Sequence, residues 1–501
     1  MRFYNTLSHS LEEFVPLTPP VVRMYTCGPT VYDYAHIGNF RSFLFADVLR
    51  RLLELRGFEV MHVMNITDVG HMTDDDVADG SGMDKMEQAA ERLREEKKKG
   101  LAHAAAIADP NDPYQIARFY TDAFLDDARS LGLKVADEYP QRMPHATQNV
   151  DMMLELIGKL VDSGHAYKAQ DGAVYYSVES FPEYGRLSGN SLDNLRGGAG
   201  GRVDAQTQAA KRHPADFLLW KPDGKHIMKW ESPFGTGYPG WHIECSAMAM
   251  RHLGAEVIDF HTGGEDNIFP HHECEIAQSR GATGREHFAR YWLHGRHLKV
   301  EGEKMSKSKG NFHTVRDVLE GRATAREVHP SVLRLELIRT HYRTSSNFTA
   351  QGLHDSARQV GRLAKLRDAA AQAAGSTRAE VTPDHPVLKR FVDALSDDLN
   401  MSEALASVNE WLNALGEGAG DPAETLGLLK KIDSVLGVLP EAGAAEARQA
   451  DDEAAAFARR IDDARAARDF AAADAVRQEA IEAGYTVSTT KQGTKVEKPL
   501  A

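Results

Sequence analysis

The chain has 501 residues, of which 42% are hydrophobic and 26% are charged, an ordinary balance for a protein that buries a hydrophobic core. At roughly 150 residues per domain, a chain of this length is expected to form about three domains. Lysine and arginine together number 59 and aspartate and glutamate 73, so the net charge is −14, which excludes a basic surface over the whole chain but not a local basic face that binds nucleic acid.

The cysteine content is low, with Cys27, Cys245 and Cys274 in the whole chain. So few cysteines argue against a disulfide framework and indicate a reducing compartment. No apolar run approaches the ~18 residues that a membrane span requires, and residues 1–10 lack the pattern of a secretory leader. We therefore expect a cytoplasmic protein without membrane contact.

The first 70 residues alternate between strand and helix patterns. Residues 21–27 and 58–66 read as strands, and residues 43–55 carry apolar side chains at helical spacing. This order predicts a parallel βαβ unit with a right-handed crossover. Ligands of such sheets bind beyond the carboxyl ends of the strands, where residues 27–28 and 67–68 fall.

The remaining chain divides by composition. Residues 73–100 are rich in both acidic and basic side chains, which predicts a polar loop and an exposed helix, and a solvated surface insertion is favoured over a binding element. Short strand patterns follow, for example at residues 173–178 and 217–220. After Ser346 the pattern is almost entirely helical, which indicates a bundle, and residues 486–498 read as a small β tail.

The tetrapeptide His36-Ile37-Gly38-Asn39 lies between the first strand and the helix expected to begin near Phe43. Backbone N–H groups at a helix N-terminus favour phosphate, and an adjacent imidazole stabilises charge that develops on a phosphoryl group. The alternative is a helix-capping turn that contains an incidental histidine.

A basic segment downstream reads Lys304-Met305-Ser306-Lys307-Ser308. Lysines act as point charges toward polyphosphate, so such a loop suits a mobile clamp on a nucleotide. Its alternative is a solvated surface loop.

A third group has the residue types of a metal site. His271 and Glu275 are four residues apart, which places them on one helix face. With the thiols of Cys27 and Cys245 they offer the ligand types that bind Zn²⁺. No Cys-x-x-Cys pair supports this interpretation, and a buried cysteine also serves as a small apolar side chain.

Taken in order, these motifs resemble those of a class I aminoacyl-tRNA synthetase. The resemblance is to cysteinyl-tRNA synthetase in particular, and it extends from Phe3 to about Thr494. The segments that carry it are residues 24–33, 65–68, 239–246 and 269–273.

The resemblance implies an α/β fold with a Rossmann-type (HUP-like) parallel-sheet catalytic domain that is split by a connective insertion. An all-α bundle and a small C-terminal anticodon-binding domain follow. The implied segments are residues 1–132 (first catalytic half, with the charged insertion at about 73–112), 133–212 (connective insertion), 213–298 (second catalytic half), 299–345 (loop and stem-contact region), 346–440 (helical bundle) and 441–501 (anticodon-binding region).

The implied activity is ATP-dependent formation of cysteinyl-adenylate, followed by transfer of cysteine to the 3′-terminal adenosine of cysteine tRNA. The family's zinc ligands map to Cys27, Cys245, His271 and Glu275, with one Zn²⁺ per subunit that discriminates cysteine from serine. Mg²⁺ is expected to accompany ATP, and the chain is expected to act as a monomer. The alternative is a ligase that passes activated cysteine to a small-molecule amine, as mycothiol-pathway enzymes do, but those lack the C-terminal region.

Further roles follow from the same resemblance. The catalytic residues would be His36, Asn39, Lys304 and Lys307. ATP would be bound by Thr30, His36, Gly38, Asn39, Gly264, Asp266 and Lys307. Cysteine would be bound by Cys27, Gly28, Thr67, Trp241 and His261. Cys274 stands where the family commonly has asparagine, and it is a competing metal ligand, a thiol open to oxidation or, as we favour, an inert thiol.

Overall fold

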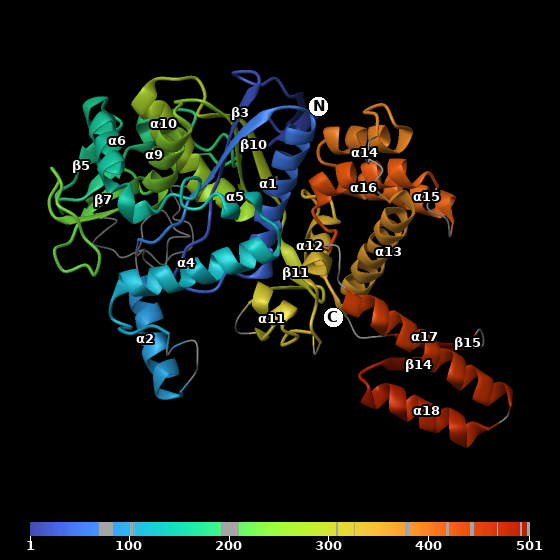
Figure 1. The fold of residues 1–501 in the computed structure, drawn as a ribbon. Helices are drawn as coiled ribbons and strands as arrows, with labels where there is room; N and C mark the ends of the chain where they lie inside the picture. The colour runs from blue at the N-terminus through green and yellow to red at the C-terminus, as the bar shows by residue number, and fades with distance from the viewer. Residues whose placement is uncertain are drawn as a thin grey trace.

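The computed structural model describes residues 1–69, 84–100, 104, 106–191, 210–306, 309–324, 326–375, 381–416, 420–440, 445–467, 469–490 and 493–497. An α/β region occupies the first part of the chain, and a helical bundle follows it (Figure 1). The last helices and hairpin form a module beyond the bundle.

The central sheet contains four parallel strands in the order β10-β9-β3-β4. They are β3 (Val21–Thr26), β4 (Glu59–Met64), β9 (Ile258–Gly264) and β10 (Ala289–Gly295). Helix α1 (Ile37–Leu55) connects β3 to β4. From β3 the chain continues outward to β4 on one side of the sheet, and from β9 it continues outward to β10 on the other side. The strand order therefore reverses between β3 and β9. Ligands of open α/β sheets bind at such a reversal.

The two strands predicted in the first 70 residues and their parallel pairing are confirmed. The helix start predicted near Phe43 is wrong, because α1 begins at Ile37. The His36 imidazole accepts the Asn39 N–H, and the Asn39 side chain accepts the His36 N–H, so a capping box starts the helix earlier than its apolar spacing indicates.

Side chains of β3 alternate between two hydrophobic cores, as expected for a strand covered on both faces. Val22 and Met24 belong to the core that includes the apolar face of α1. Tyr25 belongs to the second core, which includes residues of α9 (Trp241–Leu253) and α10 (Glu273–Thr283). Helices on both faces therefore leave the strand ends as the accessible part of the sheet.

The segment between β4 and β9 carries helices and a second sheet. The helices are α2 (Lys85–Lys98), α4 (Pro113–Ser130), α5 (Lys134–Asp137) and α6 (Val150–Asp162), with 3₁₀ turns η1 (Ala146–Gln148) and η2 (Val178–Ser180). The sheet is antiparallel, with the order β5 (Ala166–Lys168), β6 (Val174–Tyr176), β7 (Phe217–Pro222) and β8 (Gly237–Pro239). Because β6 pairs with β7, the domain boundary expected after residue 212 falls between two strands of one sheet.

Helix α2 lies in the charged segment that was expected to be solvated. The helix is present, but Met86, Ala89 and Leu93 on its inner face are buried, and it contacts α4. The expectation of a fully exposed helix is therefore wrong for this face. The polar loop expected before it lies largely outside the described residues.

The other elements complete the framework around the central sheet. Near the N-terminus, β1 (Arg2–Asn5) and β2 (Ser10–Glu13) form a hairpin. After β9 come the turn η3 (Glu265–Asn267) and the turn η4 (Ile268–His272), in which the backbone is extended at Phe269. The small sheet β12-β11-β13 and two helices follow: β11 (Leu298–Val300), β12 (Glu303–Lys304), β13 (Ser346–Phe348), α11 (Val315–Leu319) and α12 (Pro330–Ile338).

The C-terminal part is helical, as expected from its sequence pattern. The bundle contains α13 (Ala350–Ala374), α14 (Pro386–Ser396), α15 (Met401–Leu415) and α16 (Pro422–Leu436). The last module contains α17 (Ala445–Ala466), α18 (Phe470–Glu482) and the hairpin β14 (Thr486–Thr490) and β15 (Gly493–Glu497). It has its own small core.

Candidate functional site

A cavity of about 380 Å³ lies at the carboxyl ends of β3 and β9. Most of the residues assigned to the site from the sequence line it, namely Cys27, Gly28, Thr30, His36, Asn39, Thr67, Trp241, Cys245, Gly264, Asp266 and His271. His261 and Glu275 are buried beside it. Gly38 and Lys304 are not part of its lining, and Lys307 lies outside the described residues.

Four side chains meet at one end of the cavity and form what we call the Cys/His/Glu cluster: Cys27, Cys245, His271 and Glu275. The sulfurs of Cys27 and Cys245 are 3.7 Å apart. His271 Nε2 is 3.4 Å from the Cys245 sulfur and 3.2 Å from Glu275 Oε1. Glu275 Oε1 is also 3.6 Å from the Cys27 sulfur. One ligand atom from each of the four residues therefore lies within 4.8 Å of all the others.

These spacings fit a tetrahedral metal centre. Ligands placed ~2.0–2.3 Å from a zinc ion at tetrahedral corners are roughly 3.3–3.8 Å apart. Burial raises the pKa of Cys27 and of Cys245, and the nearby Glu275 carboxylate acts in the same direction on both. A cation favours the thiolate forms that burial disfavours, so this donor set is suited to hold one.

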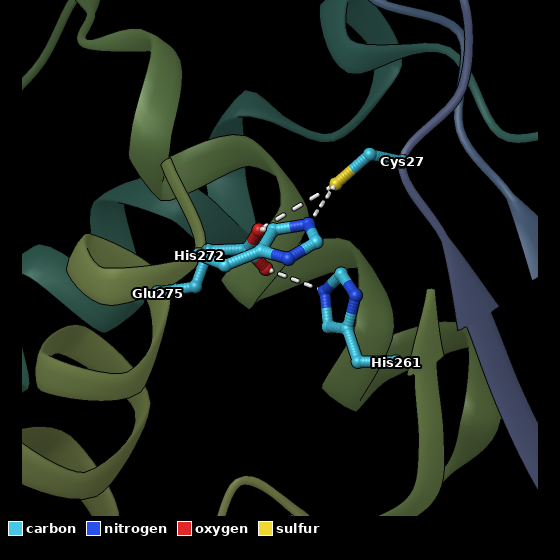
Figure 2. Close-up of side chains that lie close together, drawn as sticks. All are labelled: Cys27, His261, His272 and Glu275. Carbon is cyan, nitrogen blue, oxygen red and sulfur yellow. Dashed lines mark hydrogen bonds and ion pairs between the residues drawn. The ribbon is translucent and has the colours of Figure 1, made fainter. Parts of the chain in front are cut away.

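A second set of groups shares two members with the first. Figure 2 shows the Cys27 sulfur directed at the His272 ring and at one Glu275 oxygen, while His261 meets the other oxygen. The contacts are 3.2 Å from Cys27 to His272 Nε2, 3.6 Å from Cys27 to Glu275 and 2.9 Å from His261 Nε2 to Glu275. However, His272 Nε2 is 3.9 Å from Glu275 Oε1, and its other ring nitrogen is 2.7 Å from His294. The first set is therefore the more evenly spaced.

The cavity wall next to the cluster is held by a chain of hydrogen bonds. The Gly28 N–H donates to Asn65 Oδ1, and the Asn65 amide donates to the Thr67 hydroxyl. Thr67 in turn donates to the buried Glu244 carboxylate over 2.9 Å. A Cβ at Gly28 would lie 1.8 Å from the Asn65 carbonyl oxygen, so only glycine fits there. The Trp241 ring packs against the His271 imidazole with 4.4 Å between ring centroids.

The N-terminus of α1 forms another part of the cavity. His36 Nδ1 accepts the Asn39 N–H, so the neutral ring carries its proton on Nε2. A Cβ at Gly38 would lie 2.8 Å from the Met305 methyl group and 2.9 Å from the His36 ring. The segment that contains Lys304 therefore approaches the first helical turn, and the glycine permits this approach.

The C-terminal end of β9 provides a tight polar turn. The Gly264 N–H donates to Asn267 Oδ1 over 2.9 Å. A Cβ at Gly264 would lie 2.3 Å from a carboxylate oxygen of Asp266, so the glycine lets this acidic side chain fold against the strand end. Both residues face the same cavity as the α1 N-terminus.

Comparison with known proteins decides the family. Residues 13–358 match the family described as tRNA synthetases class I (C) catalytic domain. The cysteine–tRNA ligases of Salinibacter ruber and Solibacter usitatus are 42% and 41% identical to this chain over 99% of its length, and the matches cover 98% and 99% of those proteins. The chain belongs to the cysteine–tRNA ligase family. The resemblance inferred from the motifs is thereby confirmed.

Solved structures agree with the fold expected of the cysteine–tRNA ligase family. The methionyl-tRNA synthetase of Mycobacterium tuberculosis in complex with methionyl-adenylate matches with a TM-score of 0.52 and 15% identity over 83% of this chain and 90% of that one. The LeuRS of Agrobacterium radiobacter K84, in a ternary complex, matches with a TM-score of 0.56 and 12% identity over 85% and 84%. These likenesses concern the fold, and the predicted Rossmann-type class is confirmed.

Among the described helices, none combines the length and apolarity needed to cross a bilayer.

The sequence alone did not indicate the roles of two residues at the site of this cysteine–tRNA ligase family member, Lys85 and Asn65. Lys85 lines the cavity, although its segment was interpreted as a surface insertion. Asn65 lay within a quoted motif, but nothing in its spacing indicated that it supports Gly28.

Cys274 is buried with its sulfur 3.4 Å from the Tyr184 hydroxyl, and neither ligand set includes it, which favours the inert thiol.

Proposed function

We propose that the chain activates L-cysteine with ATP and transfers it to the 3′-terminal adenosine of cysteine tRNA, selecting the thiol with a Zn²⁺ ion held by Cys27, Cys245, His271 and Glu275. The observation that carries this proposal is the single cavity that joins the Cys/His/Glu cluster to the capped N-terminus of α1. Membership of the cysteine–tRNA ligase family supports the same activity.

Selection against serine is the main difficulty of this reaction, because the two amino acids differ by one atom. A hydrophobic pocket rejects a near-isostere only weakly. Bound Zn²⁺ deprotonates a thiol and binds the thiolate, whereas an alcohol remains a poor, neutral ligand. The buried cluster described above presents its donors toward the cavity end where the side chain of cysteine would lie.

The wall beside the cluster is suited to hold the rest of the amino acid. The Thr67 hydroxyl donates to Glu244, which leaves an oxygen lone pair to accept from a substrate ammonium. The glycine at position 28 keeps this wall flat, and Trp241 closes the side next to His271. His261, which contacts Glu275 and stacks on Trp292, is buried beside the cavity and supports the cluster through Glu275.

The first chemical step is attack by the cysteine carboxylate on the α-phosphate of ATP. An oxygen–phosphorus bond forms, the bond to the leaving pyrophosphate breaks, and pyrophosphate departs with the electron pair. Because Nδ1 of His36 accepts a backbone N–H, Nε2 carries the proton of the neutral ring and would donate to a phosphate oxygen. Asn39 and the α1 N-terminus would add further donors, and Asp266 would accept from the ribose hydroxyls.

Lysines of the basic loop would hold the pyrophosphate, with Lys304 and Lys307 as the candidates and Mg²⁺ accompanying ATP. No protein nucleophile is required, since the reaction needs orientation and charge stabilisation. In the second step, a ribose hydroxyl of the terminal adenosine attacks the cysteinyl carbonyl, and AMP leaves. The alternative transfer to a small-molecule amine is not favoured, because the relatives named cysteine–tRNA ligase align along the full chain.

Exchange of pyrophosphate into ATP, followed by charging of a cysteine tRNA transcript, tests the proposal. We expect exchange that depends on L-cysteine and not on L-serine, together with charging that requires the tRNA. Cysteine-dependent exchange without any charging would contradict the transfer step. Equal exchange with serine would contradict selection by the cluster.

A further inference from the structure

The first residue of α2 enters the cavity from the charged segment. Asp84 caps this helix, and its other carboxylate oxygen lies 2.8 Å from His226 Nε2, with both side chains buried. Two turns later, Arg92 forms an ion pair with Asp33 over 3.1 Å, and Asp33 belongs to the cavity wall. These two contacts hold the first turns of α2 in place. They fix the position of Lys85, which lies between Asp84 and Arg92 in the sequence.

The ammonium group of Lys85 lies against two aromatic rings of the cavity. Its nitrogen is 5.4 Å from the centre of the Tyr32 ring and 5.7 Å from that of Trp241. Aromatic faces attract a cation at such distances. Because Trp241 packs on His271, this contact places the positive charge at the end of the cavity where the Cys/His/Glu cluster lies.

Charge distinguishes this residue from the rest of the cavity. Among the described residues that line it, Lys85 is the one lysine or arginine, whereas Asp33 and Asp266 are acidic. Only two carbon atoms separate the sulfur of cysteine from its carboxyl carbon, so a thiol at the cluster keeps the carboxylate at the same end of the cavity. An ammonium has three N–H donors and can bind a carboxylate while it contacts the rings.

We propose that Lys85 is a substrate-binding residue that pairs with the carboxylate of L-cysteine, an inference that rests on the proposed function. The carboxylate loses its charge when the adenylate forms. The interaction is therefore stronger before the chemical step than after it, and it contributes to cysteine affinity and to the KM for cysteine.

Equilibrium binding of two thiols to the zinc-loaded protein without ATP tests this assignment. Cysteamine has the thiol and the amine of cysteine but no carboxylate. We expect Lys85→Met to weaken L-cysteine binding roughly 10- to 100-fold, as for the loss of a hydrogen-bonded charge pair, and to leave cysteamine binding within about twofold. Lys85→Arg should retain most of the affinity for cysteine. Lys98→Met, an exposed position on the same helix, is the matched control and should change neither.

Three results would overturn the assignment. One is an equal loss of affinity for both thiols, which indicates a structural role. Another is a rise in the KM for ATP with cysteine binding unchanged, which assigns the lysine to a phosphate. The third is wild-type protein that binds cysteine methyl ester as tightly as cysteine. If Lys85→Met does not fold, Lys85→Gln is measured in its place. Absence of cysteine-dependent exchange in the wild type would instead refute the proposed function itself.

Discussion

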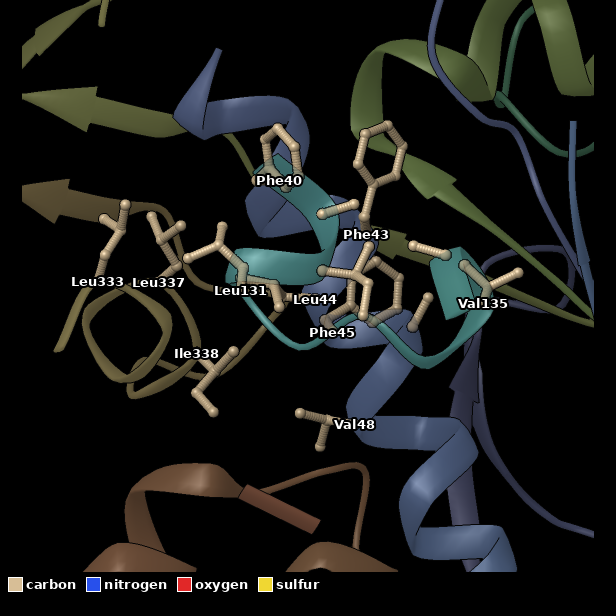
Figure 3. Packing of buried hydrophobic residues seen from close by; sticks show 14 of the residues in the cluster. Phe40, Phe43, Leu44, Phe45, Val48, Leu131, Val135, Leu333, Leu337 and Ile338 are labelled. Atoms are coloured by element: carbon tan, nitrogen blue, oxygen red, sulfur yellow. The ribbon is translucent and has the colours of Figure 1, made fainter. Parts of the chain in front are cut away.

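A buried ion pair connects the catalytic region to the helical bundle, and its removal gives a quantitative prediction. Asp47 of α1 accepts from Arg334 of α12 over 2.6 Å and from Arg51 over 2.6 Å, and its second oxygen accepts the Lys134 N–H over 3.0 Å. Arg334 also donates to the Leu436 carbonyl oxygen at the end of α16. Figure 3 shows buried apolar side chains of α1 and α12, the two helices that this ion pair joins.

The size of the effect follows from the charge environment of Asp47. Burial alone would raise its pKa, but the guanidinium groups of Arg334 and Arg51 and the Lys134 N–H lower it from 3.8 to about 2. At about 1.36 kcal/mol per pKa unit, this adds on the order of 2 kcal/mol to the free energy of unfolding at neutral pH. Because the pKa is lowered on folding, this stabilisation is present above pH 3.8 and is lost as the pH falls toward 2.

Replacement of Asp47 by asparagine removes the charge and leaves the Arg334 guanidinium buried without its partner. We expect the free energy of unfolding at pH 7.5 to fall by about 3–5 kcal/mol, as measured by urea denaturation and far-UV circular dichroism. The double variant with Arg334→Met should be less destabilised than the sum of the two single variants, since neither charge then remains buried alone. A loss below about 1 kcal/mol for Asp47→Asn, or strict additivity, would refute this reasoning.

Three further predictions concern the cavity and the C-terminal module. Gly28→Ala places a Cβ against the Asn65 carbonyl oxygen, so cysteine-dependent exchange should fall at least about 10-fold through a raised KM for cysteine; an unchanged KM would contradict the close approach. His36→Ala should slow exchange by roughly 10²- to 10³-fold with little change in cysteine affinity, whereas a rate within threefold of wild type would remove His36 from the chemistry. Truncation after Pro440 removes a module that has its own core, so exchange should persist while charging of tRNA is lost, and undiminished charging would show that the module does not serve tRNA.

The sequence predicted the parts of the fold that depend on local pattern. The parallel unit of β3, α1 and β4 follows from apolar spacing and turn residues, and the structure contains it. The boundary expected after residue 212 divides a sheet, because an apolar run such as β7 does not indicate which strand it will pair with. The start of α1 was missed because its capping box uses a histidine and an asparagine rather than the usual serine or threonine with glutamate.

The candidate site, like the fold, could be predicted from the sequence only in part. Helical spacing selected His271 together with Glu275, and the structure brings both to the two cysteines. Spacing did not distinguish the two histidines, because His272 is three residues from Glu275 and therefore also lies on that helix face. Lys85 was missed for a different reason, since its position depends on a helix that packs on α4 and begins at the cavity, in a segment with the composition of a solvated surface.

Metal analysis of the purified protein, with amino-acid selectivity measured on the same samples, tests whether a zinc ion at Cys27, Cys245, His271 and Glu275 selects cysteine. We expect about one zinc per chain and strong preference for cysteine over serine in the wild type, and loss of both in Cys245→Ala. Cys274→Ala, a buried thiol outside both ligand sets, should keep its zinc and serves as the matched control. Wild-type protein that contains no transition metal and still rejects serine would contradict the account.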